Sequence, residues 1–428
     1  MRAVEYDTPG PAGRPPDWMQ GRETKGEDVE TSPIEAIAKL LSRRASRRSA
    51  LGRLGAGGLA AAGGVGLSRA ARAQAATPAP AAAGLPSFKF GLEAAKASQF
   101  AAGLVRWGSK TQFPVLKGMA LASERIDPGG LRELHWHGNA HELNYCLRGQ
   151  GEMAVFSPDG KLETFAISVG SVSFAPMGYT HYIRNTGSEP LRLVLAFTNE
   201  QPSTFDLSTA LPVVPRNLLA QTFGVATSAF PAITNRGDQV LVPLNAQPTG
   251  PAPAAGQGLP PKPYTVNISQ VNAAVFGGGT IDTLGPQDIP QLDGITVWPL
   301  HGKPRALREP HWHPNAAELD YCISGTAQIG LTSPDGKEQT FTIGEGEIAF
   351  IPTNWFHYIA SVSDAPLEFL VFFGDPNPQH IDLSQTVAWF PPEIFAASFG
   401  VDPRAIAALP NRGDVLLAGA TPPGTPTP

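Results

Sequence analysis

The chain has 428 residues, of which 46 are glycine and 43 are proline, and its formal net charge is −5. So many helix-breaking residues argue against an all-helical protein. The lack of a basic excess argues against nucleic acid as a partner. Two cysteines are too few for a disulfide scaffold. The length is typical of two or three domains.

The N-terminal part has the features of an export signal. Arg47 and Arg48 precede a weakly apolar Gly/Ala/Leu run over residues 54–67, and residues 73–75 read Ala-Gln-Ala, a small-x-small cleavage site. The run is too short and too rich in glycine to span a membrane comfortably. We therefore expect residues 1–75 to be a leader with a twin-arginine signal peptide. The mature protein is then periplasmic or secreted, exported by the twin-arginine machinery, with no stable membrane span.

The rest of the chain contains one domain twice. Residues 133–137 read Glu-Leu-His-Trp-His, and 176 residues later 309–313 read Glu-Pro-His-Trp-His. The same offset relates the identical segments 157–161 and 333–337, among others. A constant shift over this distance requires no insertion, so the two copies arose by a gapless internal duplication. Two copies of this length exclude a solenoid.

Composition sets the domain limits. We expect a first domain over residues 86–240 and a second over 264–418. A Pro-rich linker over 244–263 joins them, and a disordered tail over 419–428 follows.

Each copy has many short extended runs and closes with a helical stretch. Turn chemistry such as Ser157-Pro-Asp-Gly160 separates the runs. Helical stretches are expected at 215–223 and 391–399. This pattern predicts an all-β fold of two jelly-roll or similar closed barrels, each with a small helical cap. The extended runs in the first copy are 143–147, 152–156, 164–167, 171–174 and 191–197.

Six of the nine histidines fall into two matching sets, each with one glutamate. Residues two apart in a strand share a face, so each His-x-His pair points both rings into its barrel. Three imidazoles and a carboxylate are costly to bury without a partner, and a divalent metal supplies one. A satisfied polar network without metal is the alternative, and it is disfavoured because the set recurs at fixed spacing. The predicted ligands are His135, His137, Glu142 and His181 in copy one, and His311, His313, Glu318 and His357 in copy two.

These ligand types leave about two open positions on an octahedral ion. Zinc usually settles at four ligands, whereas manganese or iron would keep positions open for a bidentate ligand or water. The residues alone do not select Mn over Fe, Ni or Zn.

The motifs around the histidines resemble those of the cupin family. In copy two, Arg305 and Asn354 stand at turn positions where the family has glycine, and Ser361 replaces an asparagine. Asparagine tolerates left-handed geometry, so the fold is still expected. The two motifs of the family are matched by Gly129-x5-His135-x-His137-x4-Glu142-x6-Gly149 and Gly170-x5-Pro176-x-Gly178-x2-His181-x3-Asn185.

The closer resemblance is to bicupins of the oxalate decarboxylase group, carried by segments 131–137 and 307–315. It implies two manganese ions per chain, one in each barrel, and the use of dioxygen to split oxalate into formate and carbon dioxide. It also implies that Arg132 or Arg308, three residues before the first metal histidine, holds the substrate carboxylate. A fixed planar cation suits a small carboxylate beside a metal.

The chain departs from that group at the proton donor. The family's lid glutamate corresponds to Gln201 within residues 200–204, and an amide does not supply that proton. The adjacent Glu200 is the candidate replacement acid. A second family glutamate falls at Val371. Two alternatives therefore stand beside an oxalate decarboxylase-like carboxy-lyase: a non-catalytic metal-binding or storage bicupin, and another cupin oxidoreductase such as a dioxygenase. The resemblance also allows a homo-oligomer, of a size that the sequence does not fix.

Overall fold

The computed structural model describes residues 85–428 apart from 234–236, 238, 245–263, 411–412 and 420–428. The expected leader lies outside the described residues. So do the expected linker and tail, apart from one residue of each.

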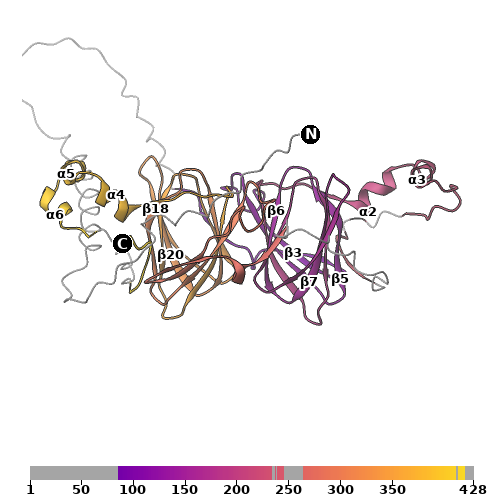
Figure 1. Cartoon of the computed structure of the whole chain (residues 1–428), viewed down its shortest axis with the longest axis horizontal. Coiled ribbons are helices and arrows are strands. Elements are labelled where there is room, and N and C mark those ends of the chain that lie inside the picture. The colour runs from indigo at the N-terminus through magenta and orange to yellow at the C-terminus, as the bar shows by residue number, and fades with distance from the viewer. Residues whose placement is uncertain (1–84, 234–236, 238, 245–263, 411–412, 420–428) are drawn as a thin grey trace, which may run out of the picture. The chain divides into compact units, whose positions relative to one another are not determined.

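The first copy folds into a barrel of two antiparallel sheets (Figure 1). One sheet has the strand order β14-β9-β6-β11-β4-β3-β2, and the other has β12-β5-β10-β7-β8 with β13 beside β5. Burial alternates along β10 of the second sheet, so every other side chain points between the sheets, whereas β4, β6, β9 and β11 of the first sheet are buried along most of their length. The strands are β2 (Ser98–Phe100), β3 (Gly103–Gly108), β4 (Ala120–Ile126), β5 (Gly130–His137), β6 (Glu142–Arg148), β7 (Gln150–Phe156), β8 (Leu162–Ser168), β9 (Ser171–Ala175), β10 (Thr180–Asn185), β11 (Leu191–Phe197), β12 (Thr204–Asp206), β13 (Leu241–Pro243) and β14 (Thr265–Asn267).

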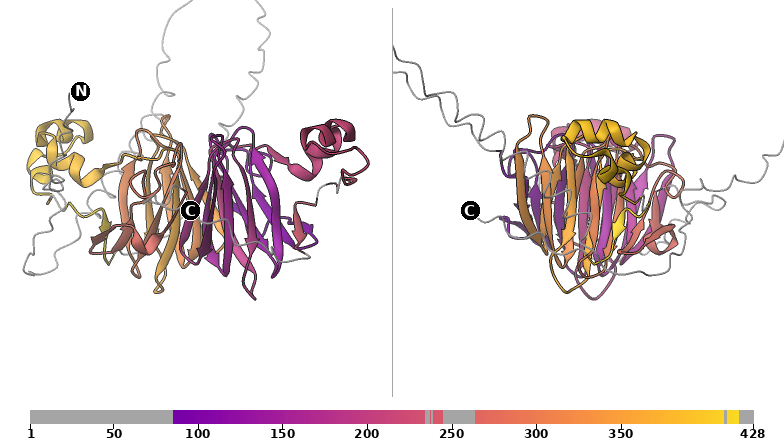
Figure 2. Two further views of the ribbon diagram at one scale, coloured as in Figure 1. Left: turned by 45° about the vertical axis from the view of Figure 1, so that its right-hand side comes forward. Right: turned by 90° about the vertical axis from the view of Figure 1, so that its left-hand side faces the viewer.

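The second copy repeats this architecture; Figure 2 shows both barrels from further sides. Its sheets have the orders β1-β22-β19-β24-β17-β16-β15 and β21-β20-β23-β18-β25, with β26 beside β18. The expectation of an all-β protein with two tandem barrels is confirmed. The strands are β1 (Lys89–Gly91), β15 (Ala273–Phe276), β16 (Gly279–Asp282), β17 (Thr296–Gly302), β18 (Leu307–Trp312), β19 (Glu318–Ser324), β20 (Thr326–Thr332), β21 (Glu338–Gly344), β22 (Glu347–Ile351), β23 (Phe356–Ser361), β24 (Leu367–Phe373), β25 (Ile381–Asp382) and β26 (Leu416–Leu417).

The described helices are few and short. The expected helical stretches contain α3 and α5, and each helix begins directly after a proline, whose fixed φ suits a helix start. The described residues between 384 and 413 belong to a separate compact unit. None of the described helices is long and apolar enough to cross a membrane. The helices are α2 (Leu207–Ala210), η2 (Leu211–Val213), α3 (Arg216–Thr222), η3 (Ile268–Gln270), α4 (Leu383–Trp389), α5 (Pro392–Phe399) and α6 (Pro403–Ala407).

The two barrels exchange one edge strand each. Strand β1, which precedes the first barrel, pairs with β22 of the second, and β14, which precedes the second barrel, pairs with β9 of the first. Leu92 follows β1 and is fully buried in a hydrophobic core that contains residues of both barrels. The sequence does not indicate this exchange, because a three-residue edge strand carries no mark of its partner.

Two turns of the second barrel keep a glycine-like backbone without glycine. Arg305 has φ 60° and Asn354 has φ 66°, and they are the only described non-glycine residues with positive φ. Their first-copy counterparts, Gly129 and Gly178, have φ 71° and 81°. The duplicated turns therefore keep their shape even where the side chain makes it less favourable.

The segment formed by β1 and the buried Leu92 gives a stability prediction. Leu92→Ala should lower the free energy of unfolding by about 2–5 kcal/mol, because it leaves a cavity in the shared core. Val213→Ala, at a side chain that is 81% exposed, should change it by less than about 0.5 kcal/mol. Urea unfolding measures both. A loss below about 1 kcal/mol for Leu92→Ala would show that this segment is not packed as described.

Candidate metal centres

A bulge in β5 turns two functional side chains to the same face. His135 pairs with His181, and Arg132 pairs with Ile183, so the two residues between them on β5 oppose a single residue of β10. In a regular strand, side chains three positions apart lie on opposite faces. The extra residue places Arg132 and His135 on one face, as bulges beside active sites commonly do. Strand β18 has the corresponding irregularity between Arg308 and His311.

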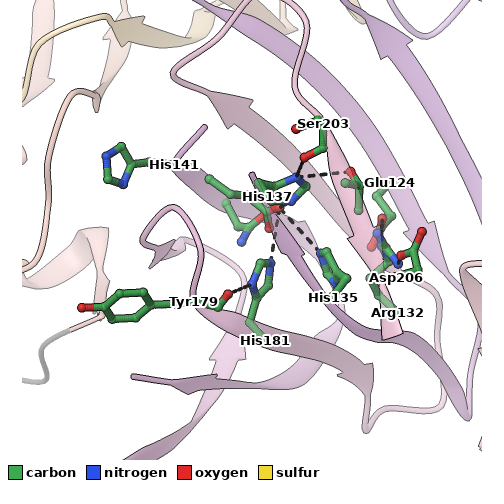
Figure 3. Close-up of polar contacts among 12 residues, drawn as sticks. Glu124, Arg132, His135, His137, His141, Tyr179, His181, Ser203 and Asp206 are labelled. Carbon is green, nitrogen blue, oxygen red and sulfur yellow. Dashed lines mark hydrogen bonds and ion pairs between the residues drawn. The ribbon is translucent and has the colours of Figure 1, made fainter. Parts of the chain in front are cut away.

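In the first barrel the four predicted ligands converge. Their ligand atoms all lie within 4.8 Å of one another, and all four residues are buried. The Glu142 Oε2 atom lies 2.6 Å from His137 Nε2, 3.5 Å from His181 Nε2 and 4.0 Å from His135 Nε2 (Figure 3). The carboxylate therefore sits among three imidazoles.

The second barrel repeats the cluster. His311, His313, Glu318 and His357 are buried, and their ligand atoms also lie within 4.8 Å of one another. The Glu318 Oε2 atom lies 2.9 Å from His313 Nε2 and 3.2 Å from His357 Nε2.

Backbone carbonyls orient the first three rings. His135 Nδ1 donates to Glu133 O at 2.7 Å, and His181 Nδ1 donates to Tyr179 O at 2.9 Å. His137 Nδ1 is 3.2 Å from the Ser203 carbonyl. A carbonyl only accepts, so Nδ1 carries the proton and Nε2 turns its lone pair toward the cluster. This is the usual arrangement behind a metal-bound histidine.

The same support recurs in the second barrel. There the Nδ1 atoms donate to the carbonyls of Glu309, Gln379 and Trp355 at 2.7, 2.7 and 2.9 Å. These carbonyl contacts are not predicted from the sequence in either barrel, although four of the six partners stand two residues before their histidine.

The electrostatics of the clusters favour a cation. Burial, together with the Arg132 charge, lowers the pKa of His135 well below its ordinary value, so the ring is neutral. Burial alone would raise the pKa of Glu142, but the surrounding histidines outweigh it and hold this pKa well below normal. Glu142 Oε1 and Glu318 Oε1 are buried without a hydrogen-bond partner among the described residues. Ionised carboxylates that face imidazole lone pairs fit a metal ion as their common partner.

The space beside the two clusters differs greatly. The first barrel has a cavity of about 420 Å³ lined by Arg132, His135 and Glu142 among others, whereas the second has about 30 Å³. Ala122 lines the first cavity, and Trp298 stands at the equivalent position of the second. The Trp298 ring packs 5.2 Å from Phe373, and its Nε1 donates to Leu284 O at 3.0 Å. The Trp298 indole therefore occupies space beside the second cluster that Ala122 leaves open beside the first.

Both predicted carboxylate-binding arginines are already paired. Arg132 Nη1 donates to Asp206 Oδ1 at 2.7 Å, and Arg308 Nη1 donates to Asp382 Oδ1 at 2.6 Å. Both arginines are buried beside their clusters. Arg132 lines the larger cavity, so it lies where a substrate carboxylate beside the first cluster would reach it. Asp206 fixes the guanidinium and also offsets part of its charge.

The structure does not bring Glu200 to the cluster. Its carboxylate accepts a hydrogen bond from the Gly118 amide at 2.8 Å and lies 3.1 Å from Lys110 Nζ. The Gly118 amide, with help from Lys110, lowers the pKa of Glu200. Glu200 does not line the first cavity. An acid held ionised outside the cavity is poorly suited to donate a proton inside it.

A different acid, which belongs to no sequence motif, lines the first cavity. Glu124 on β4 is 2% exposed and lies with Arg132 and Asp206 on one side of the histidines (Figure 3). A comparison of the two copies would have indicated it, because the equivalent residue 176 positions later is Leu300. An acid in one copy at a position where the other copy has a buried leucine is a candidate functional residue.

Comparison with known proteins agrees with this architecture. The chain is 27% identical over 292 residues to oxalate decarboxylase OxdC of Bacillus subtilis, which covers 68% of this chain and 76% of that protein. It is 27% identical over 343 residues to a probable oxalate decarboxylase of Arthroderma benhamiae, covering 78% and 84%. The solved structure of the Bacillus subtilis oxalate decarboxylase at pH 4.6 superposes with a TM-score of 0.72 at 24% identity, covering 78% of this chain and 88% of that one.

One family model also matches the chain twice. The model of the cupin family matches residues 92–229 and again 269–407, so it covers both barrels and their clusters. This chain belongs to the cupin family and is a bicupin.

Proposed function

We propose that this bicupin is a manganese-dependent carboxy-lyase that resembles oxalate decarboxylase and acts on oxalate or a related small carboxylate. The observation that carries the proposal is the buried cluster of three histidines and a glutamate beside Arg132 in the open cavity of the first barrel. The relatives named oxalate decarboxylases, which match across both domains, support the substrate class. A solved structure that describes Mn(II) centres in the Bacillus subtilis enzyme supports the metal.

The four-residue clusters would hold one ion each, through Nε2 atoms and a carboxylate oxygen. A bound manganese ion supplies positive charge beside the substrate and, with dioxygen, a route for electron transfer. The protein's own contribution is orientation. Carbonyls fix the rings, Asp206 fixes Arg132, and the guanidinium binds the far carboxylate of the substrate.

We place the reaction in the first barrel. Its cavity of about 420 Å³ admits a small carboxylate, whereas about 30 Å³ beside the second cluster does not. On this proposal the second cluster holds a metal that supports the fold.

The cavity also supports a second candidate, a cupin dioxygenase that acts on a bulkier carboxylate. Phe100, Trp107 and Phe197 line one part of the cavity, and its volume lies in the range of pockets that hold larger ligands. The deciding experiment loads the purified protein with manganese and measures formate and carbon dioxide from oxalate, then repeats the assay with aromatic carboxylates under oxygen. Formate from oxalate supports the first function, and oxygen uptake with only the aromatic substrates supports the second. No turnover with tight metal binding would favour metal storage.

The two clusters should lose their metals independently. His137→Ala should remove one of two manganese ions per chain and His313→Ala the other, because each removes a ligand from one cluster. Elemental analysis of purified protein measures the ions, and far-UV circular dichroism checks the fold. Two ions still bound to folded His137→Ala would contradict the ligand assignment.

Filling the first cavity should stop turnover without removing metal. Ala122→Trp copies the indole of the second barrel, so we expect two ions per chain and an activity loss of about 100-fold or more. Ala166→Trp is the matched control, because residue 166 is exposed on β8 and does not line the cavity. Full activity of Ala122→Trp with both metals bound would place the reaction in the second barrel.

Export is a separate proposal that rests on the sequence. We propose that the arginine pair at 47–48 directs the folded protein through the twin-arginine machinery to the periplasm or beyond. Replacing both arginines by lysine should leave the protein in the cytoplasm. Cell fractionation measures this, and unchanged export of the double variant would contradict it.

A further inference from the structure

We infer that Glu124 is the proton donor of the first barrel and takes the place of the lid glutamate that this chain lacks. The inference rests on the proposed function and adds a residue to it. It begins from position, because Glu124 lines the same cavity as His135, His137 and Arg132, and its side chain is buried.

The Glu124 carboxyl is unlike the other acids near the cluster, because nothing pairs with it closely. Its Oε2 atom is 4.0 Å from Arg132 Nε, beyond hydrogen-bond distance, and its Oε1 atom is buried without a hydrogen-bond partner among the described residues. Asp206, by contrast, accepts from Arg132 at 2.7 Å, and Glu142 is held by the histidines. A buried carboxyl without a close donor holds its proton to a higher pH than an exposed one.

The charges that face Glu124 are few. Arg132, His135 and His137 face the cavity from β5, Glu142 from β6 and Asp206 from β12. Strands β3 and β11, which flank Glu124 in its sheet, contribute only uncharged side chains to the cavity: Val105, Trp107, Leu195 and Phe197.

Burial dominates the protonation of this acid. It raises the pKa of Glu124 to about 7, the Arg132 charge acts in the opposite direction, and the Glu142 charge raises the pKa further. A divalent cation at the cluster adds positive charge, so the pKa in the metal-loaded protein lies below this value.

The duplication supplies an internal comparison. The second barrel keeps all four cluster residues and the arginine, yet it has Leu300 in place of Glu124 and Trp298 in place of Ala122. The acid is therefore present where the cavity is open and absent where it is closed. The two arginines have equivalent aspartate partners, Asp206 and Asp382. If Glu124 served only to hold Arg132, an equivalent acid would be expected beside Arg308.

The chemistry needs one proton. Cleavage of oxalate breaks the carbon–carbon bond, carbon dioxide leaves, and the electron pair stays on the retained carbon. That carbon takes the proton from the Glu124 carboxyl and becomes formate. One carbon is oxidised and the other reduced, so no net oxidant is consumed. The Glu124 carboxylate then regains a proton from solvent.

The test compares Glu124→Gln with wild type, both loaded with manganese. The amide keeps the shape but has no acidic proton, so kcat should fall by about 10²–10⁴-fold while KM and metal content change little. In wild type, kcat should fall as the pH rises through the pKa of Glu124, because the donor is competent only when protonated. A purely structural role would instead raise KM or release metal. Glu189→Gln, at an exposed ion pair with Arg148, is the control for the Glu-to-Gln change.

A second readout does not depend on turnover. Infrared difference spectra should show the C=O stretch of a protonated carboxyl that titrates near pH 7 in metal-free wild type and is missing in Glu124→Gln. Absence of that band would overturn the inference. So would full activity of Glu124→Gln, or loss of activity in Glu200→Gln alone. Wild type that turns over no carboxylate would overturn the proposed function, whereas an active wild type with an unaffected Glu124→Gln variant would overturn only this inference.

Discussion

A carboxylate buried among three imidazoles requires a cation, and this requirement organises the interior of both barrels. Each ring turns Nε2 inward because its Nδ1–H is bound to a backbone carbonyl. Those carbonyls are fixed by the strands and turns of the barrel. The clusters therefore depend on the geometry of the sheet rather than on flexible side chains, and this rigidity is what a preorganised metal site needs. The bulge in β5 adds the arginine to the same face.

The duplication shows that the same barrel backbone can enclose two cavities of different size and polarity. Both copies keep the cluster, the arginine and its aspartate, and even the left-handed turns, where Arg305 and Asn354 adopt the backbone of glycine. The residues that line the two interiors differ at several positions, among them strand β4 and its counterpart β17, where Ala122 and Glu124 correspond to Trp298 and Leu300. On this strand the second copy has an indole and an aliphatic side chain where the first has a methyl group and a carboxyl, and the space beside the second cluster is correspondingly smaller.

Much of this could be predicted from the sequence, and the failures have physical causes. Spacing within one strand predicts that His135 and His137 share a face, and an exact repeat identifies the second cluster. Period-two alternation puts Arg132 on the wrong face, because a bulge leaves no clear signature in the sequence. Glu200 was chosen for its place in the chain, but the path of its loop and the Gly118 amide direct the side chain elsewhere. Glu124 belongs to no motif, and in the sequence only its contrast with Leu300 of the second copy distinguishes it.

The exchanged strands determine when each barrel can complete its folding during synthesis of the chain. Strand β1 is among the first described segments to be made, yet its partner β22 is made only with residues 347–351. The first barrel likewise waits for residues 265–267 to cover β9. Neither barrel is complete until most of the chain has been synthesised, and a chain cut between the copies would leave each half with an uncovered sheet edge, a template for aggregation. The two barrels therefore complete their folding together, although the sequence consists of two separate copies of one domain.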